Sequence, residues 1–154
     1  MTSQAAAAPS AGLIHRIERA RAALEATPLS ITQLLARVGV GAVFFKSGMT
    51  KIASWEFTLM LFREEYRVPV LPPEIAAPLA TATELSMPVL LVLGLFARLA
   101  TLPLLGMVLV IQIFVYPQSW AEHLTWAALL LLILTRGPGA ISLDRLIAPA
   151  LFSR

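Results

Sequence analysis

Four stretches of the chain consist almost entirely of apolar residues, and they predict four membrane-spanning helices. The stretches cover about residues 31–50, 76–96, 99–116 and 121–136. An α-helix needs roughly 20 apolar residues to cross the hydrocarbon core of a bilayer. No water satisfies backbone polar groups at that depth, so each span is expected to be helical. The predicted fold class is an all-α membrane protein whose residues 31–147 form a four-transmembrane-helix bundle.

The segment before the bundle has a different pattern. Residues 1–11 are predicted to be disordered, and in residues 12–27 apolar side chains recur at spacings of 4, 3 and 4 residues: Leu13, Ile17, Ala20 and Leu24. Charged residues occupy the other sides, which favours an amphipathic N-terminal interfacial helix on the membrane surface over a solvated charged helix. Residues 1–30 are therefore assigned to a disordered start and this helix, and residues 148–154 to a C-terminal tail.

The longest connection, residues 51–75, is polar and ends in the proline-rich segment around Pro72. Its middle, Trp55–Tyr66, is predicted to form a short surface helix. The other two connections are tight, around residues 97–98 and 117–121. The long connection is the candidate contact surface for a periplasmic redox partner, over residues 52–75.

Basic residues near the span ends predict the orientation of the chain. Seven arginines fall on one side of a four-span arrangement: Arg16, Arg19, Arg21, Arg98, Arg136, Arg145 and Arg154. Three basic residues fall on the other: Lys51, Arg63 and Arg67. Because basic residues are enriched in cytoplasmic loops, both termini are expected to be cytoplasmic, in a multi-pass protein of a bacterial inner membrane.

Composition supports a membrane location and excludes several kinds of chemistry. Apolar residues make up 58% of the chain and charged residues 14%, against about 25% charged in soluble proteins. Cysteine is absent, which excludes thiol–disulfide chemistry, cysteine-bound metals and iron–sulfur clusters. The net charge of +3 comes from residues beside the spans and does not indicate nucleic-acid binding. No metal site is predicted, and a haem is not expected because the only two histidines, His15 and His123, belong to opposite sides.

Ionisable residues inside spans are costly and mark either a functional site or a structural pair. Glu84 and Arg37 are the candidate catalytic residues. Six others are candidate ligand-binding residues: Lys46, Lys51, Gln112, Tyr116, His123 and Trp126. The set suits a polar, partly aromatic pocket for a ligand head group. A structural ion pair and a proton or ion pathway are the alternatives, and the aromatic residues taken singly are typical of a membrane interface.

Helical geometry places most of this polar set in the outer half of the bundle. At 1.5 Å per residue Glu84 lies roughly 12 Å below the outer end of its span, whereas Arg37 lies about 20 Å deep. On the first helix Arg37 shares one face with four other residues: Gly41, Phe44, Gly48 and Lys51. Lys46 points nearly the opposite way, so its side chain can extend toward the membrane surface.

Three ordered segments resemble the DoxX family of membrane proteins. RVGVGAVFFKSGMTK, from Arg37 to Lys51, resembles the first-span signature of an Arg, small residues, a Phe, Ser-Gly and a Lys. ELSMPVLLVLGLFAR, from Glu84 to Arg98, is similar to the second span, and RGPGAISLD, from Arg136 to Asp144, to the exit from the fourth. The resemblance covers about residues 31–147 and implies a four-helix membrane bundle.

The resemblance also implies an association with redox biology, because relatives include a subunit of a thiosulfate:quinone oxidoreductase and components of oxidoreductase complexes in stress defence. The first hypothesis is therefore a quinone-binding subunit of a membrane redox system, with quinone as the candidate cofactor and Glu84 as proton carrier. The second is a non-catalytic membrane anchor or assembly partner, and the third a small proton-coupled transporter. Glycine-bearing helix faces also permit a homo-oligomer.

Overall fold

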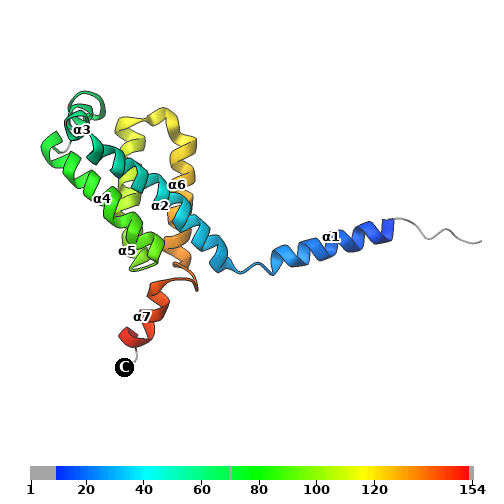
Figure 1. Cartoon of the computed structure of the whole chain (residues 1–154). Coiled ribbons are helices and arrows are strands. Elements are labelled where there is room, and N and C mark those ends of the chain that lie inside the picture. The colour runs from blue at the N-terminus through cyan, green and yellow to red at the C-terminus, as the bar shows by residue number, and fades with distance from the viewer. Residues whose placement is uncertain (1–9, 70, 153–154) are drawn as a thin grey trace, which may run out of the picture.

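The computed structural model describes residues 10–69 and 71–152 (Figure 1). The predicted disordered start, apart from residues 10 and 11, lies outside the described residues. All regular elements in the described part are helices. Four long ones form the body of the molecule: α2 (Leu29–Ala53), α4 (Pro73–Leu93), α5 (Ala97–Val110), which a π-helical turn η2 (Ile111–Val115) continues, and α6 (Trp120–Arg136).

Within the described residues, three helices are long and apolar enough to cross a membrane: Leu29–Ala53, Pro73–Leu93 and Ala97–Val115. They correspond to the first three predicted spans, with boundaries shifted by up to three residues. The helix at the fourth predicted span, α6, has 17 residues. Prolines explain part of the shift, because Pro73 can begin a helix that the prediction starts three residues later.

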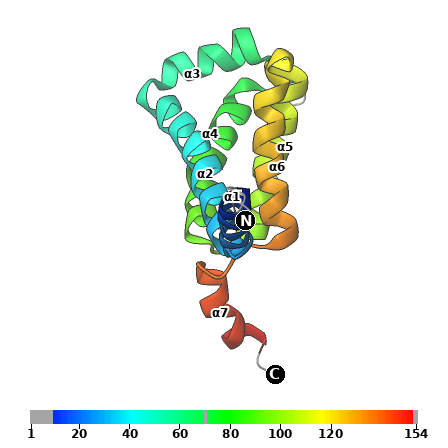
Figure 2. The same ribbon diagram turned by 90° about the vertical axis from the view of Figure 1, so that its right-hand side faces the viewer.

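The four long helices form a closed ring in which each packs against two others. α2 contacts α4 and α6, and α5 contacts α4 and α6 (Figures 1 and 2). The α2–α4 contact is close because of two glycines. A Cβ on Gly41 would lie 2.8 Å from Val92 Cγ2, and one on Gly48 would lie 3.0 Å from Glu84 Cβ. The two glycines therefore let the backbones of α2 and α4 approach closely.

Apolar side chains from all four helices fill the centre of the ring. The buried residues include Val40 and Phe44 of α2, Leu91 of α4, Leu104 of α5 and Leu130 of α6. Polar residues gather at the two ends of this core. The molecule therefore has an apolar middle between two polar layers, as expected for a helix bundle in a bilayer.

Two short elements cross one end of the ring, which we call the outer end. α3 (Trp55–Leu61) and the π-helical turn η1 (Phe62–Tyr66) lie across it in Figure 2. Thr58 is buried and its hydroxyl donates to the carbonyl of Lys51 at 2.9 Å. Phe62 packs with Ala76 and Ala77 in a second apolar cluster. The predicted surface helix over Trp55–Tyr66 is thus present and attached to the bundle.

The opposite, inner end is closed by the segment that follows α6. Gln33 Nε2 donates to the carbonyl of Gly137 at 2.9 Å, and Arg37 Nη2 donates to the carbonyl of Ile141. Asp144 accepts from the backbone N–H groups of Phe96, at 2.6 Å, and Ala97, at 3.0 Å. Its carboxylate therefore occupies the N-terminus of α5, where free N–H groups favour a negative charge.

Helices also extend from the inner end at both ends of the chain (Figure 1). α1 (Ser10–Glu25) begins at Ser10, two residues before the predicted start, and exposes Leu13 and Ile17. Whether α1 lies on a membrane surface stays a prediction. α7 (Leu143–Phe152) runs through the predicted boundary between bundle and tail at residue 147. The prediction missed it although Leu143, Leu146, Ile147 and Leu151 recur at helical spacing, a usable signal for an amphipathic helix.

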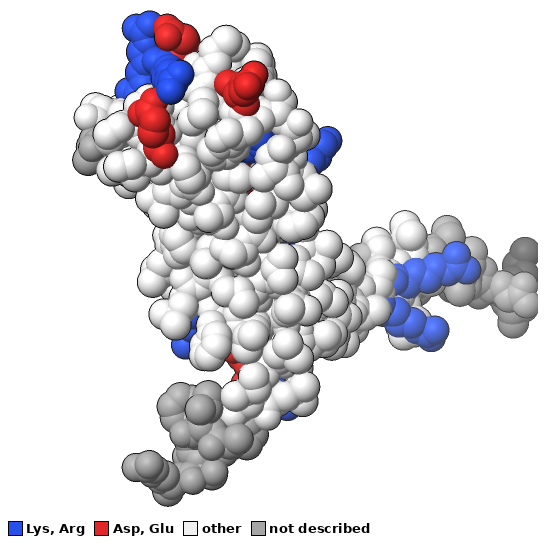
Figure 3. Space-filling model, turned by 60° about the vertical axis from the view of Figure 1, so that its left-hand side comes forward, with Lys and Arg blue, Asp and Glu red and all other residues white. Residues whose placement is uncertain are grey.

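The outward faces of the bundle are apolar. Figure 3 shows charged side chains gathered at the outer end and along α1, with an uncharged band between the two ends of the bundle. Leu35, Leu79, Leu99, Leu109 and Leu124 are each more than half exposed in this chain. A soluble monomer rarely exposes so large a continuous apolar surface. The band is consistent with contact to lipid.

Candidate functional site

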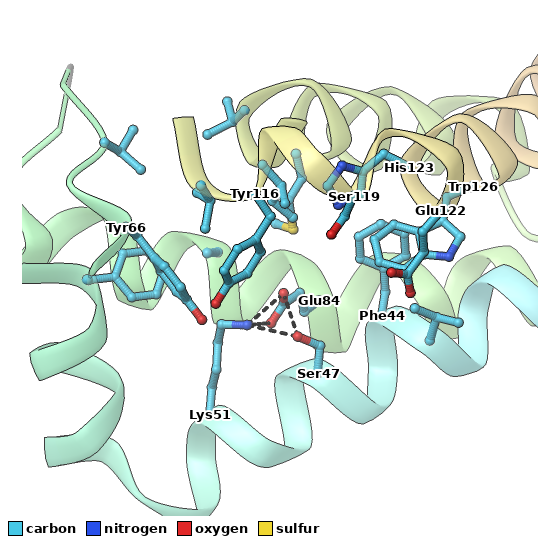
Figure 4. A pocket seen from close by; sticks show the side chains of 18 residues that line it. Phe44, Ser47, Lys51, Tyr66, Glu84, Tyr116, Ser119, Glu122, His123 and Trp126 are labelled. Carbon is cyan, nitrogen blue, oxygen red and sulfur yellow. Dashed lines mark hydrogen bonds and ion pairs between the residues drawn. The ribbon is translucent and has the colours of Figure 1, made fainter. Parts of the chain in front are cut away.

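A cavity of about 280 Å³ lies inside the ring near its outer end (Figure 4). Side chains of α2, α4, α5 and α6 surround it, and η1 contributes Phe62 and Tyr66. Most of the lining is apolar or aromatic, including Phe44, Met107 and Trp126. A few polar groups face this apolar space, which is the usual composition of a site for a small organic ligand.

The polar centre of the cavity is formed by Lys51, Glu84 and Ser47. Lys51 Nζ lies 2.8 Å from each carboxylate oxygen of Glu84. The ammonium group also donates to Ser47 Oγ at 2.9 Å, and the Ser47 hydroxyl donates to Glu84 Oε1 at 3.0 Å. The side chain of Glu84 is 3% exposed and that of Lys51 is 14% exposed. The pair is therefore desolvated, and each charge depends on the other.

Local sequence explains why these groups meet. Ser47 and Lys51 are four residues apart, so they lie on the same face of α2, one turn apart. Gly48 sits between them and allows the backbone of α4 to approach at Glu84. A larger residue at Gly48 would push α4 away and lengthen the distance between Lys51 and Glu84.

Two tyrosines form the outer wall of the cavity, and a π-helical turn positions each: Tyr66 is the last residue of η1, and Tyr116 directly follows η2. In η1 the N–H of Arg67 bonds to the carbonyl of Phe62, and in η2 the N–H of Tyr116 bonds to that of Ile111. The rings of Tyr66 and Tyr116 meet edge to face with centroids 6.0 Å apart. Tyr116 also donates from its hydroxyl to Glu65 Oε1 at 2.5 Å. Turns of this kind occur often at functional sites, where the extra residue re-aims side chains.

The α6 wall contains His123 and Trp126. Gln112 Nε2 donates to the carbonyl of Pro117 at 2.9 Å, so its Oε1 faces His123 Nδ1 at 2.7 Å. This contact places the proton of a neutral imidazole on Nδ1 and leaves Nε2 as an acceptor. The Trp126 ring packs edge to face on Phe44 with centroids 5.6 Å apart.

The structure brings together five of the predicted site residues. Glu84, Lys51, Tyr116, His123 and Trp126 line the cavity, and Gln112 supports it through His123. Two predicted residues are not part of it. Lys46 is exposed on the opposite face of α2, and Arg37 is fully buried at the inner end, where it bonds to Ile141. Glu84 therefore pairs with Lys51 rather than with Arg37 or Lys46.

Sequence reasoning missed several residues of the cavity. Ser47 lies next to the helix face that carries Gly48 and Lys51. Its spacing of four residues from Lys51 could have predicted that the two side chains meet. Tyr66 and Glu122 belong to polar connections or helix ends, whose folding back onto the bundle no periodicity predicts. Glu65 does not line the cavity but accepts the hydrogen bond from Tyr116, which does. The π-helical turns also carry no recognisable signal in the chain.

Comparison with known proteins assigns a family. The DoxX family model matches residues 32–117, which is more than half of the 154 residues. The chain belongs to the DoxX family. No curated protein and no solved structure matches the chain significantly.

Family membership and the apolar helices make this DoxX protein a multi-pass membrane protein. The matched segment contains Ser47, Lys51, Tyr66, Glu84 and Tyr116, which form most of the polar part of the cavity. It ends at residue 117, before α6. His123 and Trp126 thus lie outside the matched region of the DoxX family, although they complete the cavity.

The cavity of the DoxX protein offers both hydrogen-bond donors and acceptors. The Lys51 ammonium group and the Tyr66 hydroxyl can donate to a ligand carbonyl, and Glu84 can accept or release a proton. Within the part of the chain that the structure describes, no three His, Cys, Asp or Glu side chains gather as a metal site requires. The arrangement thus suits an uncharged organic ligand with polar groups on a flat, apolar frame.

The two tyrosines should make stability depend on alkaline pH. Burial raises the pKa of Tyr66, and the hydrogen bond to Glu65 raises the pKa of Tyr116. In an unfolded chain both phenols ionise near pH 10. The folded protein holds these protons more tightly, so stability is fully present below about pH 10 and falls as the pH rises above it.

The measurement is phenolate absorbance together with the unfolding midpoint in dodecyl sulfate, both followed against pH. The chain has only two tyrosines, so the folded protein should show little phenolate near pH 10. Tyr116→Phe should reduce the loss of stability at high pH. Normal ionisation of both tyrosines in the folded protein would contradict the expected hydrogen bond between Glu65 and Tyr116.

Proposed function

We propose that the outer cavity binds a quinone head group and that the protein is a membrane subunit of a redox system. The observation that carries the proposal is the desolvated Lys51–Glu84 pair, which faces an aromatic cavity in a membrane bundle. A quinone is a flat, uncharged ring with two carbonyl acceptors. It therefore matches a site whose walls are apolar and whose few polar groups can donate hydrogen bonds and exchange protons.

The polar residues have separate roles in this proposal. Lys51 and one of the tyrosines donate to the carbonyl oxygens and stabilise negative charge that develops on them. Reduction of a quinone to a quinol takes up two electrons and two protons. Glu84 delivers one of these protons and water at the outer end delivers the other, and the electrons come from a partner protein at the outer loop, residues 52–75, or from a small reductant.

The alternative hypotheses differ in what the cavity does. In a non-catalytic anchor the Lys51–Glu84 pair only fixes the packing of α2 against α4. Trp55, Phe57 and Met60, which α3 exposes, would then form the contact surface. In a proton-coupled transporter Glu84 would have to receive the substrate. The contact between Lys51 and the carboxylate disfavours a cationic substrate, so the transporter is the weaker alternative.

Ligand binding tests the proposal directly. The protein is titrated with a quinone analogue in lipid nanodiscs, and tryptophan fluorescence reports binding because Trp126 lines the cavity. Glu84→Gln keeps the shape of the side chain and removes its charge. We expect saturable binding to the wild type and an affinity about tenfold lower in the variant, the equivalent of one charge-assisted hydrogen bond.

A matched pair of lysine substitutions separates the cavity from the general surface. Lys51→Met should weaken binding, and Lys46→Met should leave it unchanged because Lys46 is exposed on the opposite face of the same helix. Equal binding in all variants, or no saturable binding in the wild type, would rule out a quinone site in this cavity.

The proposal includes a fourth span and cytoplasmic termini. α6 packs along both α2 and α5, and its 17 residues extend for about 26 Å, close to the thickness of a hydrocarbon core of about 30 Å. Contacts such as Ser30 Oγ with the N–H of Ala140, at 2.9 Å, hold the start of α2 and the segment after α6 at one end. An even number of crossings accounts for this arrangement.

Single cysteines can test this topology because the chain has none of its own. In intact bacterial cells a membrane-impermeant maleimide should label Ser54→Cys and Gln118→Cys. Ala140→Cys should be labelled only after the membrane is opened. Labelling of residues 118 and 140 from the same side would show that α6 does not cross.

A further inference from the structure

A groove runs along the outward seam between α4 and α5 beside the cavity. Its volume is about 300 Å³, and its walls include Leu79 and Thr83 of α4 and Pro103 of α5. Counted down from the outer ends of the two helices, Leu79 lies about 9 Å deep and Pro103 about 18 Å deep. The groove thus extends from the outer surface toward the middle of the hydrocarbon core.

The groove and the cavity share part of their walls. Five residues line both: Phe62, Val68, Ala80, Met107 and Val110. The small side chain of Ala80 lies on α4 one turn from Glu84, so the shared wall begins beside the polar centre of the cavity. Figure 4 shows that Glu84 and Lys51 point into this cavity from α4 and α2.

Two other apolar grooves are not connected in this way. The groove between α2 and α4 shares no lining residue with the cavity, and the one between α5 and α6 shares only His123. His123 is held by Gln112 at 2.7 Å, so that wall is fixed by a hydrogen bond. The α4–α5 seam is therefore the best-connected side path toward lipid among these grooves.

The chemistry of the seam suits a hydrocarbon chain. Its only polar side chain is that of Thr83, whose hydroxyl donates to the carbonyl of Leu79 at 2.8 Å within its own helix. A hydrocarbon chain in the groove therefore contacts no side-chain polar group that lacks a hydrogen-bond partner. The polar centre of the cavity, by contrast, needs a ligand with hydrogen-bonding groups.

We propose that the ligand of the cavity is an amphiphile with a long hydrocarbon chain, which leaves the cavity past Ala80 and lies in the α4–α5 seam. This inference rests on the proposed function and narrows it: the substrate class is a membrane-resident quinone with a chain, and a small water-soluble ring is not the natural ligand. The ring lies at the polar centre, and the chain stays in contact with lipid through the open side of the groove.

The test compares a benzoquinone without a chain with the same ring carrying a decyl chain, in nanodiscs. Ala80→Phe narrows the shared wall, and Thr83→Phe fills the seam at a residue that does not line the cavity. Ala82→Phe is the matched control, since Ala82 is exposed on α4 and lines neither space. The apparent affinity of each ligand is compared between variants in the same nanodiscs, so the partition of that ligand into lipid affects all variants equally.

We expect the chain-bearing ring to bind about tenfold more weakly to Ala80→Phe and Thr83→Phe, because overpacking excludes the chain. The chainless ring should bind Thr83→Phe like the wild type, and Ala82→Phe should change neither. Unchanged affinity of the chain-bearing ring in Thr83→Phe would overturn the seam proposal while the quinone site stands. Failure of both rings, with and without the chain, to bind the wild type would instead overturn the proposed function, and the seam proposal with it.

A photoreactive group at the end of the chain gives an independent readout. Cross-links to α4 around Leu79 and Thr83, or to α5 around Pro103, would support the assignment. Saturable cross-linking to the α5–α6 groove, at Leu109 or Leu124, would overturn it and place the chain on the other side of the bundle.

Discussion

Replacing Lys51 by Met is expected to destabilise the folded protein by about 3–5 kcal/mol, as found when one partner of a buried ion pair is removed. Glu84 is nearly inaccessible, and in the wild type its carboxylate oxygens contact Lys51 and Ser47. Met keeps most of the volume of the lysine stem but supplies no donor. The remaining carboxylate would keep one hydrogen bond, from Ser47, and would have no cation beside it. The measurement is the unfolding midpoint in dodecyl sulfate, followed by circular dichroism.

The double substitution Lys51→Met with Glu84→Gln separates folding from function. Removing both charges of a buried pair is often close to neutral, because the desolvation penalty disappears with the attraction. Stability should therefore return to within about 1 kcal/mol of the wild type, whereas binding of the quinone analogue should not return. If the double variant restores binding as well, the pair serves packing alone and neither of its charges is needed for the ligand.

Lys46→Met provides the matched control for stability. Lys46 lies on the same helix but is exposed, so its replacement should change the unfolding free energy by less than about 0.5 kcal/mol. A comparable loss of stability in both lysine variants would mean that the charge of α2, rather than the contact with Glu84, is what matters.

The periodic part of this fold could be predicted from sequence. Long apolar runs have one stable structure in lipid, so the helical spans follow from hydropathy alone. The glycine-bearing face of the first span likewise follows from a spacing near 3.6 residues per turn. Gly41, Phe44 and Gly48 are buried on this face in the structure.

The pairing of charges could not be predicted in the same way. Depth along a helix gives one coordinate, and by depth alone Lys46, which lies five residues deeper in the first span than Lys51, is the nearer partner for Glu84. Rotation about the helix axis decides between them, and Lys51 reaches inward because it lies one turn from Ser47 on the α4-facing side. Arg37 also faces inward, but its carbonyl partner, that of Ile141, is 104 residues away in sequence.

The outer part of the site was the least predictable. Tyr66 reaches the cavity because α3 and η1 fold across the bundle, and this fold depends on the contact of Phe62 with Ala76 and Ala77. Contacts between a polar connection and a span leave no periodic trace. They can be inferred only once the bundle itself is known.

A methyl group at Gly94 is expected to destabilise the inner end by about 3 kcal/mol. Gly94 has φ of 69°, and a left-handed backbone costs a residue with a Cβ roughly 1–2 kcal/mol. The Cβ would also lie 2.1 Å from Arg37 Nη1 and 2.5 Å from Ser142 Cβ. Both neighbours are held in place, Arg37 by Ile141 and the segment around Ser142 by Asp144 at the start of α5. Overpacking of this kind adds about 1–3 kcal/mol.

Gly106→Ala tests whether the effect is specific to the inner end. Gly106 lies within α5, and a Cβ there would meet nothing within 4 Å, so alanine should stabilise the helix by up to about 1 kcal/mol. Unfolding midpoints of the two variants should therefore move in opposite directions. Because the cavity is at the outer end, Gly94→Ala protein that remains folded should still bind the quinone analogue with wild-type affinity. A loss of binding in that folded protein would show that the inner end, with Arg37, is coupled to the cavity through α2, and would return Arg37 to the functional site.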